Sequence, residues 1–206
     1  MLPHSYIFIN CFAKKLKRIS TSNKTKINLP HLWFLTDIKK IPNIFSIVNL
    51  LPKGTGVILR DYNLKDRLYF AKELSSISKK KQLKLLIGGD PYIALKVKAD
   101  GVHWPQKLIK PIPFTHNNNW IITTSTHDYI SLKKAQALNV DAAFISPVFF
   151  TTSHTHAKPI ETFTLAKYSR IISLPLIALG GINSNNISML RNSNVYGIAA
   201  ISAFIK

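Results

Sequence analysis

Paired glycines near the C-terminal end of the chain could bring backbone N–H groups against an anion. Gly180 and Gly181 follow an apolar run at residues 175–179 and precede the polar residues Asn183 and Ser184. Glycine lets the backbone approach a phosphate closely, and a helix beginning at Asn183 and Ser184 would add partial positive charge. The pattern predicts a phosphate-binding turn, with an ordinary glycine-rich connection as the alternative.

A second apolar run, at residues 197–204, follows after one helix length. Gly197 and the pair Ile201 and Ser202 could close the same pocket from this run. Two successive strand ends of this kind are typical of the phosphate site in a (β/α)8 barrel, which the loops after strands seven and eight form. The two runs together therefore indicate a phosphorylated ligand.

Two other side chains have the chemistry that an anionic substrate and a proton transfer would need. Arg60 carries a planar, permanently charged guanidinium that suits a phosphate or pyrophosphate. Its alternative is an ion pair with Asp61 or a neighbouring carboxylate. His127 can move a proton near neutral pH. Its alternative is to cap the following helix or to bind a carbonyl group.

The segment TTSHTHAK, at residues 151–158, is interpreted as an anion-binding lid. It combines four hydroxyl groups with His154, His156 and Lys158. A metal site at its His-Thr-His sequence lacks neighbouring residues that would complete a coordination sphere. We expect His154 and Lys158 to meet the anion, and a solvated loop is the alternative.

These residues fall at the ends of apolar runs that alternate with helical segments or loops. Such runs are typical of parallel strands that are covered on both faces. We therefore predict one compact (β/α)8 TIM barrel over residues 31–206, with reactive groups at its C-terminal strand ends. The eight strands are expected at residues 32–36, 56–60, 83–87, 101–104, 120–124, 142–148, 175–179 and 197–204.

Capping or first-turn residues mark the beginnings of three expected helices. Asn63 is the expected cap of a helix at residues 64–80, and either Asp128 or Ser131 begins the helix after the fifth strand. Pro91 suits the first turn of a helix after the third strand.

The composition fits a single domain that handles anionic small molecules. The chain has 206 residues and a formal net charge of +19, but its basic residues are dispersed without an aromatic-interleaved stripe. We expect no nucleic-acid partner, because A/T-biased codons account for the excess of Lys, Asn and Ile. No apolar run approaches the ~20 residues that span a bilayer, so no membrane partner is expected. The single cysteine, Cys11, fits a reducing cytoplasm.

Residues 1–30 form a basic N-terminal extension, which we expect to be partly ordered and outside the barrel. No acidic residue precedes Asp37, whereas Lys and Arg residues crowd the extension. An organelle transit segment is the alternative. The short stretch after Phe204 leaves no room for a final helix, so the extension or a second subunit must cover apolar barrel surface. We therefore expect a homodimer.

Seven motifs, taken in order, resemble the thiamine phosphate synthase and thiazole tautomerase family. They read FLTD, GVILR, ADGVHWPQ, TTSTHD, ISPVFFTTSH, ALGGI and GIAAISAF, and they extend from Leu32 nearly to the C-terminus. The resemblance implies a synthase that couples hydroxymethylpyrimidine pyrophosphate to thiazole phosphate and releases pyrophosphate with the help of magnesium. The alternatives are a thiazole tautomerase with His127 as its acid–base group and a catalytically silent barrel that binds a phosphorylated ligand.

The same resemblance assigns roles to individual positions. Arg60 and Ser125 match residues that contact the pyrophosphate, and Thr151 and Ser153 match residues that touch the thiazole. The catalytic candidates are therefore Arg60, His127, His154 and Lys158. The substrate-binding candidates are Ser125, Thr151, Ser153, Gly180, Gly181, Ile201 and Ser202, of which Gly181 and Ser202 match the phosphate-binding backbone.

The expected metal ligands depart from the family pattern. The family's Asn-Asp pair falls on Gly88 and Gly89, with Asp90 displaced by one position, and its second carboxylate falls on Leu108. The lysine after the sixth strand is replaced by His154. We expect that Mg2+, if it binds at all, uses Asp90, and that cationic side chains take over part of its role.

Overall fold

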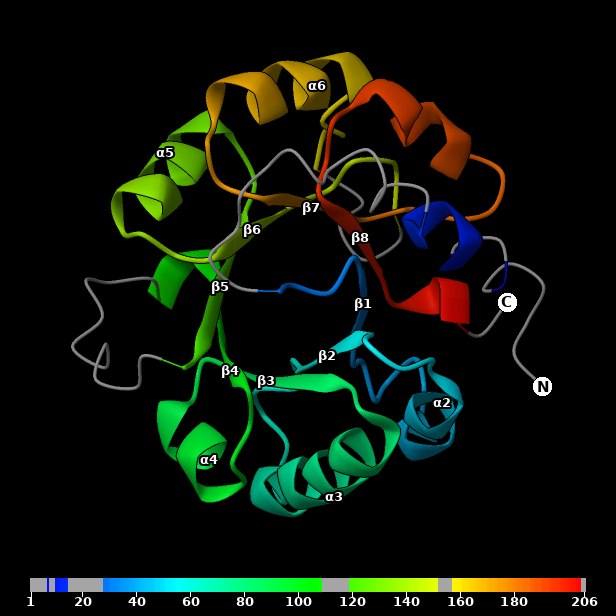
Figure 1. The fold of residues 1–206 in the computed structure, drawn as a ribbon, viewed down its shortest axis with the longest axis vertical. Coiled ribbons are helices and arrows are strands. Elements are labelled where there is room, and N and C mark those ends of the chain that lie inside the picture. The colour runs from blue at the N-terminus through cyan, green and yellow to red at the C-terminus, as the bar shows by residue number, and fades with distance from the viewer. Residues whose placement is uncertain (1–6, 8–9, 15–27, 109–118, 152–156, 205–206) are drawn as a thin grey trace.

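The chain folds into a closed barrel of eight parallel strands, in which β8 is hydrogen-bonded to β1 (Figure 1). The computed structural model describes residues 7, 10–14, 28–108, 119–151 and 157–204. The predicted (β/α)8 barrel is confirmed. The strands are β1 Leu32–Leu35, β2 Gly56–Leu59, β3 Lys84–Gly88, β4 Gly101–Trp104, β5 Ile121–Thr126, β6 Ala142–Ile145, β7 Leu176–Leu179 and β8 Gly197–Ala200.

Helices surround the barrel and connect one strand to the next (Figure 1). The α-helices follow β1, β2, β3, β5 and β6, whereas short 3₁₀-helices follow β4, β7 and β8. The α-helices are α2 Ile44–Leu50, α3 Arg67–Lys81, α4 Pro91–Lys96, α5 Tyr129–Ala137 and α6 Thr162–Ile171, and the 3₁₀-helices are η2 Gln106–Leu108, η3 Ile187–Asn192 and η4 Ser202–Phe204.

Side chains that alternate along the strands fill the inside of the barrel. The rings of Trp33 and Phe144 meet edge to face with their centres 5.3 Å apart, and both side chains are fully buried. Gly56 leaves room for this packing, because a Cβ atom there would lie 2.1 Å from Cε3 of Trp33. Ile58 also packs inside the barrel, so Arg60 follows on the same face of the chain where β2 ends.

Two of the three predicted helix beginnings are correct. Pro91 lies in the first turn of α4, and the side chain of Asp128 accepts a hydrogen bond from the Ser131 N–H at 2.7 Å at the start of α5. The prediction for Asn63 is wrong, because α3 begins only at Arg67. The turn before α3 places the Arg67 side chain beneath the ends of β2 and β3, where it is buried.

Two strands end three or more residues earlier than predicted. β6 stops at Ile145, and Pro147 follows with no N–H that could continue the ladder. β8 stops at Ala200, after which the chain turns outward into η4. There Phe204 is fully buried, and its ring packs edge to face on Phe34 with centres 4.9 Å apart. Burial of this phenylalanine ends the strand.

Gly197 begins β8 and therefore lies at the opposite end of the strand from Ile201 and Ser202. A Cβ atom at this position would lie 2.6 Å from the carbonyl oxygen of His31. The expectation that Gly197 closes the phosphate pocket is wrong. The glycine instead allows the strand to pack closely against the segment before β1.

The described parts of the N-terminal extension pack against the barrel. Residues 10–14 are helical, and Phe12 and Ala13 are buried in the layer between strands and helices. Figure 1 shows this dark blue helix beside η3 and η4. Leu29 is buried inside the barrel, and Trp33 Nε1 donates a hydrogen bond to the Pro30 carbonyl at 2.8 Å. These residues complete the domain rather than standing apart from it.

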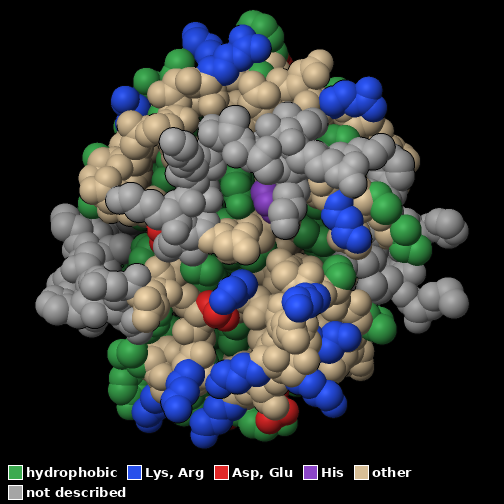
Figure 2. All heavy atoms as spheres, viewed as in Figure 1, with side chains coloured by type: hydrophobic (Ala, Val, Ile, Leu, Met, Phe, Trp, Pro, Cys, Tyr) green, Lys and Arg blue, Asp and Glu red, His purple; other side chains and the backbone are tan. Residues whose placement is uncertain are grey.

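Basic side chains occupy separate groups on the molecular surface. Figure 2 shows Lys and Arg side chains spread over several elements of this face, with few acidic side chains between them. Within the part of the chain that the structure describes, no helix combines the length and the apolar character needed to cross a membrane.

Candidate active site

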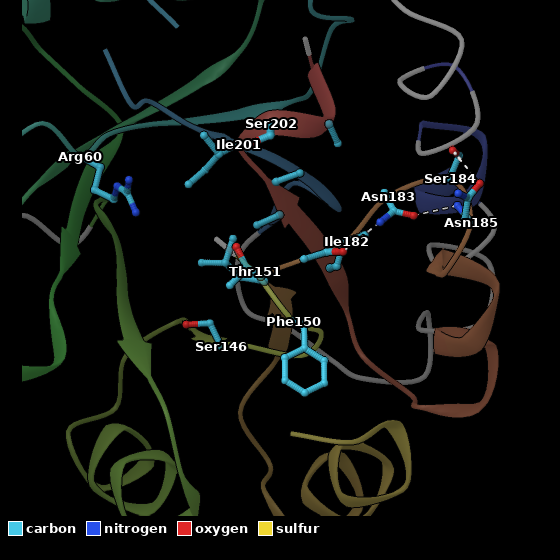
Figure 3. Close-up of a pocket in the computed structure, with 16 residues that line it drawn as sticks. Arg60, Ser146, Phe150, Thr151, Ile182, Asn183, Ser184, Asn185, Ile201 and Ser202 are labelled. Atoms are coloured by element: carbon cyan, nitrogen blue, oxygen red, sulfur yellow. Dashed lines mark hydrogen bonds between the residues drawn. The ribbon is translucent and has the colours of Figure 1, made fainter. Parts of the chain in front are cut away.

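A cavity of about 410 Å³ opens where β6, β7 and β8 end (Figure 3). The loops after these three strands and the residue after β2 form its walls. Residues that are far apart in the sequence meet here because the carboxyl ends of all eight strands lie on one face of the barrel. Six of the predicted site residues line the cavity: Arg60, Thr151, Gly180, Gly181, Ile201 and Ser202.

The two glycines of the β7 loop adopt backbone conformations that other residues rarely take. Gly180 has a φ of +96° and Gly181 a φ of +67°. A Cβ atom on Gly181 would lie 2.3 Å from the carbonyl oxygen of Phe150. The Phe149 N–H donates a hydrogen bond to the Gly180 carbonyl at 3.0 Å, which holds the β6 loop against this turn. The turn therefore requires glycine for both its conformation and its close packing.

An asparagine-rich turn follows the glycines in place of the predicted helix start. Asn183 Oδ1 accepts a hydrogen bond from the Asn185 N–H at 2.9 Å, and Asn186 Nδ2 donates one to the Gly181 carbonyl at 2.8 Å. The predicted helix start at Asn183 and Ser184 is wrong, because these local side-chain bonds compete with helical ones. The helical residues begin at Ile187 and form the short 3₁₀-helix η3.

Backbone N–H groups remain available at the wall of the cavity. The N–H groups of Gly181 and Ser202 make no hydrogen bond within the described part of the chain. Such groups carry partial positive charge and can bind the oxygens of an anion. This wall can therefore bind a phosphate group through backbone N–H groups, without the end of an α-helix.

Arg60 lies across the cavity from the asparagine turn (Figure 3). Its Nη2 atom forms an ion pair with Asp37 Oδ2 at 3.0 Å, which is the alternative that the sequence left open. The Arg60 side chain is still 30% exposed. It also borders a second cavity of about 380 Å³, next to the loops after β1 and β2. One guanidinium therefore serves as a wall of both cavities.

Ser125 lies near the end of β5, next to a buried histidine. Its Oγ atom is 2.9 Å from Nε2 of His103, whose Nδ1 atom is 2.8 Å from Oγ1 of Thr123. Burial, together with the nearby charge of Arg60, lowers the pKa of His103 from its ordinary value of 6.5 to about 3. The imidazole between these two hydroxyl groups is therefore neutral at physiological pH.

His127 follows β5 at the open end of the barrel, and its side chain is exposed. Its Nδ1 atom is 2.7 Å from the carbonyl oxygen of Ser146, a residue that lines the cavity. A carbonyl oxygen only accepts hydrogen bonds, so Nδ1 is the protonated nitrogen in this contact. The contact with a carbonyl group is one of the alternatives that the sequence left open. It positions the ring at the edge of the cavity.

Comparison with known proteins decides the family. A family model described as thiamine monophosphate synthase matches residues 34–204. The chain belongs to this family. A relative from Aquifex aeolicus, provisionally named thiamine-phosphate synthase 2, is 39% identical over 87% of this chain and 100% of its own length. The thiamine-phosphate synthase of Clostridium tetani is 29% identical over 82% of this chain and 81% of its own length.

Solved structures agree with this assignment. A thiamine phosphate pyrophosphorylase from Pyrococcus furiosus superposes with a TM-score of 0.74 at 26% sequence identity. The match covers 85% of this chain and 86% of that chain. The thiamine monophosphate synthase family is a family of transferases, and the closed eight-stranded barrel is the fold that the two structures share.

The carboxylates of this family member do not fit a magnesium site. Asp90 caps α4 by accepting a hydrogen bond from the Ile93 N–H at 2.8 Å, and it lies 3.6 Å from Arg67 Nη1. Asp37 is paired with Arg60. Among the described residues, no three His, Cys, Asp or Glu side chains group together as metal ligands. The strand-end carboxylates bind cationic side chains and backbone N–H groups instead.

Of the predicted site residues that the structure describes, Lys158 and Ser125 do not line the cavity. Lys158 is exposed and is not among the residues that line the cavity. Ser153 and His154 lie outside the described residues, as does His156. Ser125 is also absent from this wall and lies beside His103.

Sequence reasoning missed a buried arginine near the site. Arg67 is 8% exposed and donates hydrogen bonds to the carbonyl oxygens of Asp61, Leu59 and Gly88. Burial lowers its pKa, and the charge of Asp90 opposes this shift. A signal was present, because Arg67 shares a helical face with the buried residues of α3 at positions 71, 74 and 78. Lining residues that the sequence analysis did not name include Ser146, Phe150 and Ile182.

Proposed function

We propose that this family member forms thiamine phosphate from hydroxymethylpyrimidine pyrophosphate and thiazole phosphate. The bond between the pyrimidine methylene carbon and the pyrophosphate oxygen breaks, and pyrophosphate leaves with the bonding electrons. The thiazole nitrogen then donates its lone pair to the resulting pyrimidine cation and forms the new C–N bond. Membership of the thiamine monophosphate synthase family supports this reaction.

One observation carries the assignment of roles: Arg60 and the glycine-rich wall border the same cavity. The N–H groups of Gly181 and Ser202 bind the thiazole phosphate, with Gly180 shaping the turn and Ile201 packing beside it. Arg60 on the opposite side binds the pyrophosphate. Two anionic groups held at opposite sides place the reacting carbon and nitrogen between them.

The leaving pyrophosphate needs positive charge close to it. In this proposal Arg60 supplies that charge, and Ser125 adds a hydrogen bond. Lys158 and His154, which belong to the loop after β6, are further cationic candidates, and Thr151 and Ser153 of the same loop contact the thiazole. We assign no step to Mg2+, because the carboxylate of Asp90 already pairs with Arg67 and caps α4.

A coupling assay tests the proposal. The purified full chain is incubated with both phosphorylated precursors, once with Mg2+ and once with EDTA, and thiamine phosphate is measured by chromatography. We expect product that requires both precursors and that persists in EDTA. Product only with Mg2+ would contradict the metal-free site. The absence of product in both conditions would contradict the synthase.

A thiazole tautomerase is the second candidate, and the contact of His127 with Ser146 favours it. That contact holds an imidazole at the edge of the cavity, and tautomerisation requires no metal. If this reading holds, thiazole isomers interconvert without any pyrimidine substrate, and His127→Gln abolishes the conversion. Binding of thiazole phosphate without either reaction would identify a silent binder.

We also propose that the enzyme is a cytoplasmic homodimer that binds phosphorylated thiazole and pyrimidine compounds but neither nucleic acid nor membranes. Exposed apolar side chains on α6 and η3 support a second copy as the partner, because Phe163 is 82% exposed and Met189 59% exposed. Light scattering on the eluting protein measures the mass, and the mass of a single chain would contradict the dimer.

A further inference from the structure

A chain of three hydrogen-bonding side chains leads from the inside of the barrel toward the candidate active site. Thr123 is fully buried, His103 is 1% exposed, and Ser125 is partly exposed where β5 ends. The imidazole bridges the two hydroxyl groups, with Nδ1 2.8 Å from Thr123 Oγ1 and Nε2 2.9 Å from Ser125 Oγ. Its ring is held edge to face on Phe144, with centres 4.9 Å apart.

The direction of the hydrogen bonds along this chain depends on the tautomer of His103. A neutral imidazole has one N–H donor and one bare nitrogen acceptor, whereas a hydroxyl group has one hydrogen and two lone pairs. If Nε2 carries the proton, it donates to Ser125, and Nδ1 accepts the hydrogen of Thr123. If Nδ1 carries the proton, both bonds reverse.

The burial of Thr123 selects the first arrangement. Within the described residues, the only hydrogen-bond partner of the Thr123 hydroxyl is Nδ1 of His103. When Nδ1 accepts, the hydroxyl hydrogen of Thr123 is satisfied. When Nδ1 donates, that hydrogen is left buried without an acceptor, which is the costlier state. Nε2 is therefore the protonated nitrogen.

The same arrangement decides what Ser125 can offer to a ligand. Once the Ser125 oxygen accepts the Nε2 hydrogen, its own hydrogen has no acceptor among the described residues. Ser125 lies where β5 ends, and Arg60 follows the end of β2, so an anion that Arg60 attracts lies at the same end of the barrel as this hydroxyl. An anionic oxygen can only accept hydrogen bonds, which is what the Ser125 hydrogen requires.

We propose that His103 is a positioning residue, whose Nε2–H makes the Ser125 hydroxyl a hydrogen-bond donor to the substrate pyrophosphate. The inference rests on the proposed function for the identity of the ligand. The tautomer itself follows from the contacts with Thr123 and does not depend on the reaction. His103 touches no substrate, and its effect on turnover passes through Ser125.

The tautomer can be measured directly in the wild-type protein. Long-range 1H–15N correlation spectra of 15N-histidine-labelled protein separate the two neutral tautomers, and His103→Gln assigns the resonance. We expect the Nε2–H form of His103 between pH 6 and 8, as its low pKa requires the neutral ring. Thr123→Val should weaken this preference, because it removes the hydroxyl group that selects the tautomer. The Nδ1–H form in the wild type would overturn the proposal.

Binding of inorganic pyrophosphate tests the role of Ser125. Calorimetry should show that Ser125→Ala and His103→Phe each weaken binding roughly 10-fold or more, as loss of a hydrogen bond to a charged group implies. The double variant should bind no worse than Ser125→Ala alone, because His103 acts on the ligand only through the Ser125 hydroxyl. His103→Gln, which keeps an N–H near the Nε2 position, should recover part of the affinity.

His31→Phe is the matched control, because His31 lies before β1 at the other end of the barrel and stacks on Tyr196. It should bind pyrophosphate like the wild type. Multiplying losses in the double variant would overturn the role of His103 while leaving the synthase intact. A wild-type protein that binds no pyrophosphate would instead contradict the proposed function, and with it the ligand named here.

Discussion

Arg60 is the residue on which the proposed reaction depends most. Its guanidinium borders both cavities and pairs with Asp37 at 3.0 Å. We predict that Arg60→Ala lowers kcat/KM for coupling roughly 100-fold or more, the size of loss seen when a group that stabilises developing charge is removed. The affinity for thiazole phosphate should stay unchanged, because that ligand binds at the opposite wall.

Steady-state kinetics and calorimetry on the same preparation separate these two effects. Asp37→Asn is the companion variant, since it frees the guanidinium without removing it, and it should retain most of the turnover. If Arg60→Ala lost turnover and thiazole phosphate affinity to the same extent, the assignment of Arg60 to the pyrophosphate would be wrong.

Gly181 tests the phosphate wall at the residue scale. A side chain at this position would collide with the Phe150 carbonyl and would force a φ of +67° on a residue with a Cβ atom. We predict that Gly181→Val loses affinity for thiazole phosphate and destabilises the fold by about 1–3 kcal/mol through backbone strain. Calorimetry with thiazole phosphate and thermal unfolding measure the two effects.

Gly54 provides a matched control for strain alone. It also has a positive φ, +82°, but a Cβ atom there would meet no atom within 4 Å. Gly54→Val should therefore destabilise the protein without changing the affinity for thiazole phosphate. If both variants bound the ligand like the wild type, the phosphate wall would lie elsewhere.

At the scale of elements, the start of α5 shows how one carboxylate stabilises a helix. The pKa of Asp128 is lowered, chiefly by the hydrogen bond from the Ser131 N–H. We predict that Asp128→Ala costs about 1 kcal/mol of stability at pH 7, the usual value for an N-cap. Urea unfolding at several pH values measures the difference between this variant and the wild type.

The pH dependence of that difference has a definite sign. Because the pKa of Asp128 is lower in the folded than in the unfolded chain, the stabilisation is present above the ordinary value of 3.8. It is lost as the pH falls further, through the folded pKa. Asp66→Ala is the control, because Asp66 precedes α3 without a side-chain cap bond, and it should change stability by less than about 0.5 kcal/mol. Equal losses in both variants would contradict the cap.

The same scale shows where sequence reasoning succeeds for single elements. Pro91 and Asp128 could be predicted because each acts on backbone groups within one turn of its own position. The predicted helix start at Asn183 was wrong for a related reason. Its side chain can cap a helix or form a local turn, and its contact with the Gly181 carbonyl favours the turn. Local propensity alone does not separate these two outcomes.

For the molecule as a whole, the barrel was predictable because the order of the strands follows from apolar runs that alternate with helical segments. Ile58 faces inward, and side chains two residues apart on a strand lie on the same face. The alternation of side chains along a strand therefore suffices to predict that Arg60 reaches the mouth of the barrel. The partners of Asp90 and Ser125 were not predictable in this way. Arg67 and His103 reach them from other elements, and such contacts depend on strand register and helix position.

The N-terminal extension is the last test at this scale. Phe12 is 9% exposed and packs into the layer between strands and helices, although it precedes the first strand by many residues. We predict that Phe12→Ala destabilises the whole domain by about 3–5 kcal/mol, because a buried aromatic side chain is lost. Urea unfolding followed by circular dichroism should show one transition, shifted to lower urea.

Cys11→Ala is the neighbouring control, because Cys11 is exposed on the same helical segment. This substitution should leave the urea midpoint of unfolding unchanged. If residues 10–14 did not pack into the barrel, Phe12→Ala would have the same urea midpoint of unfolding as the wild type. A shifted midpoint with an unchanged slope would mean instead that residues 10–14 unfold together with the barrel, since the slope reports the surface exposed in that single transition.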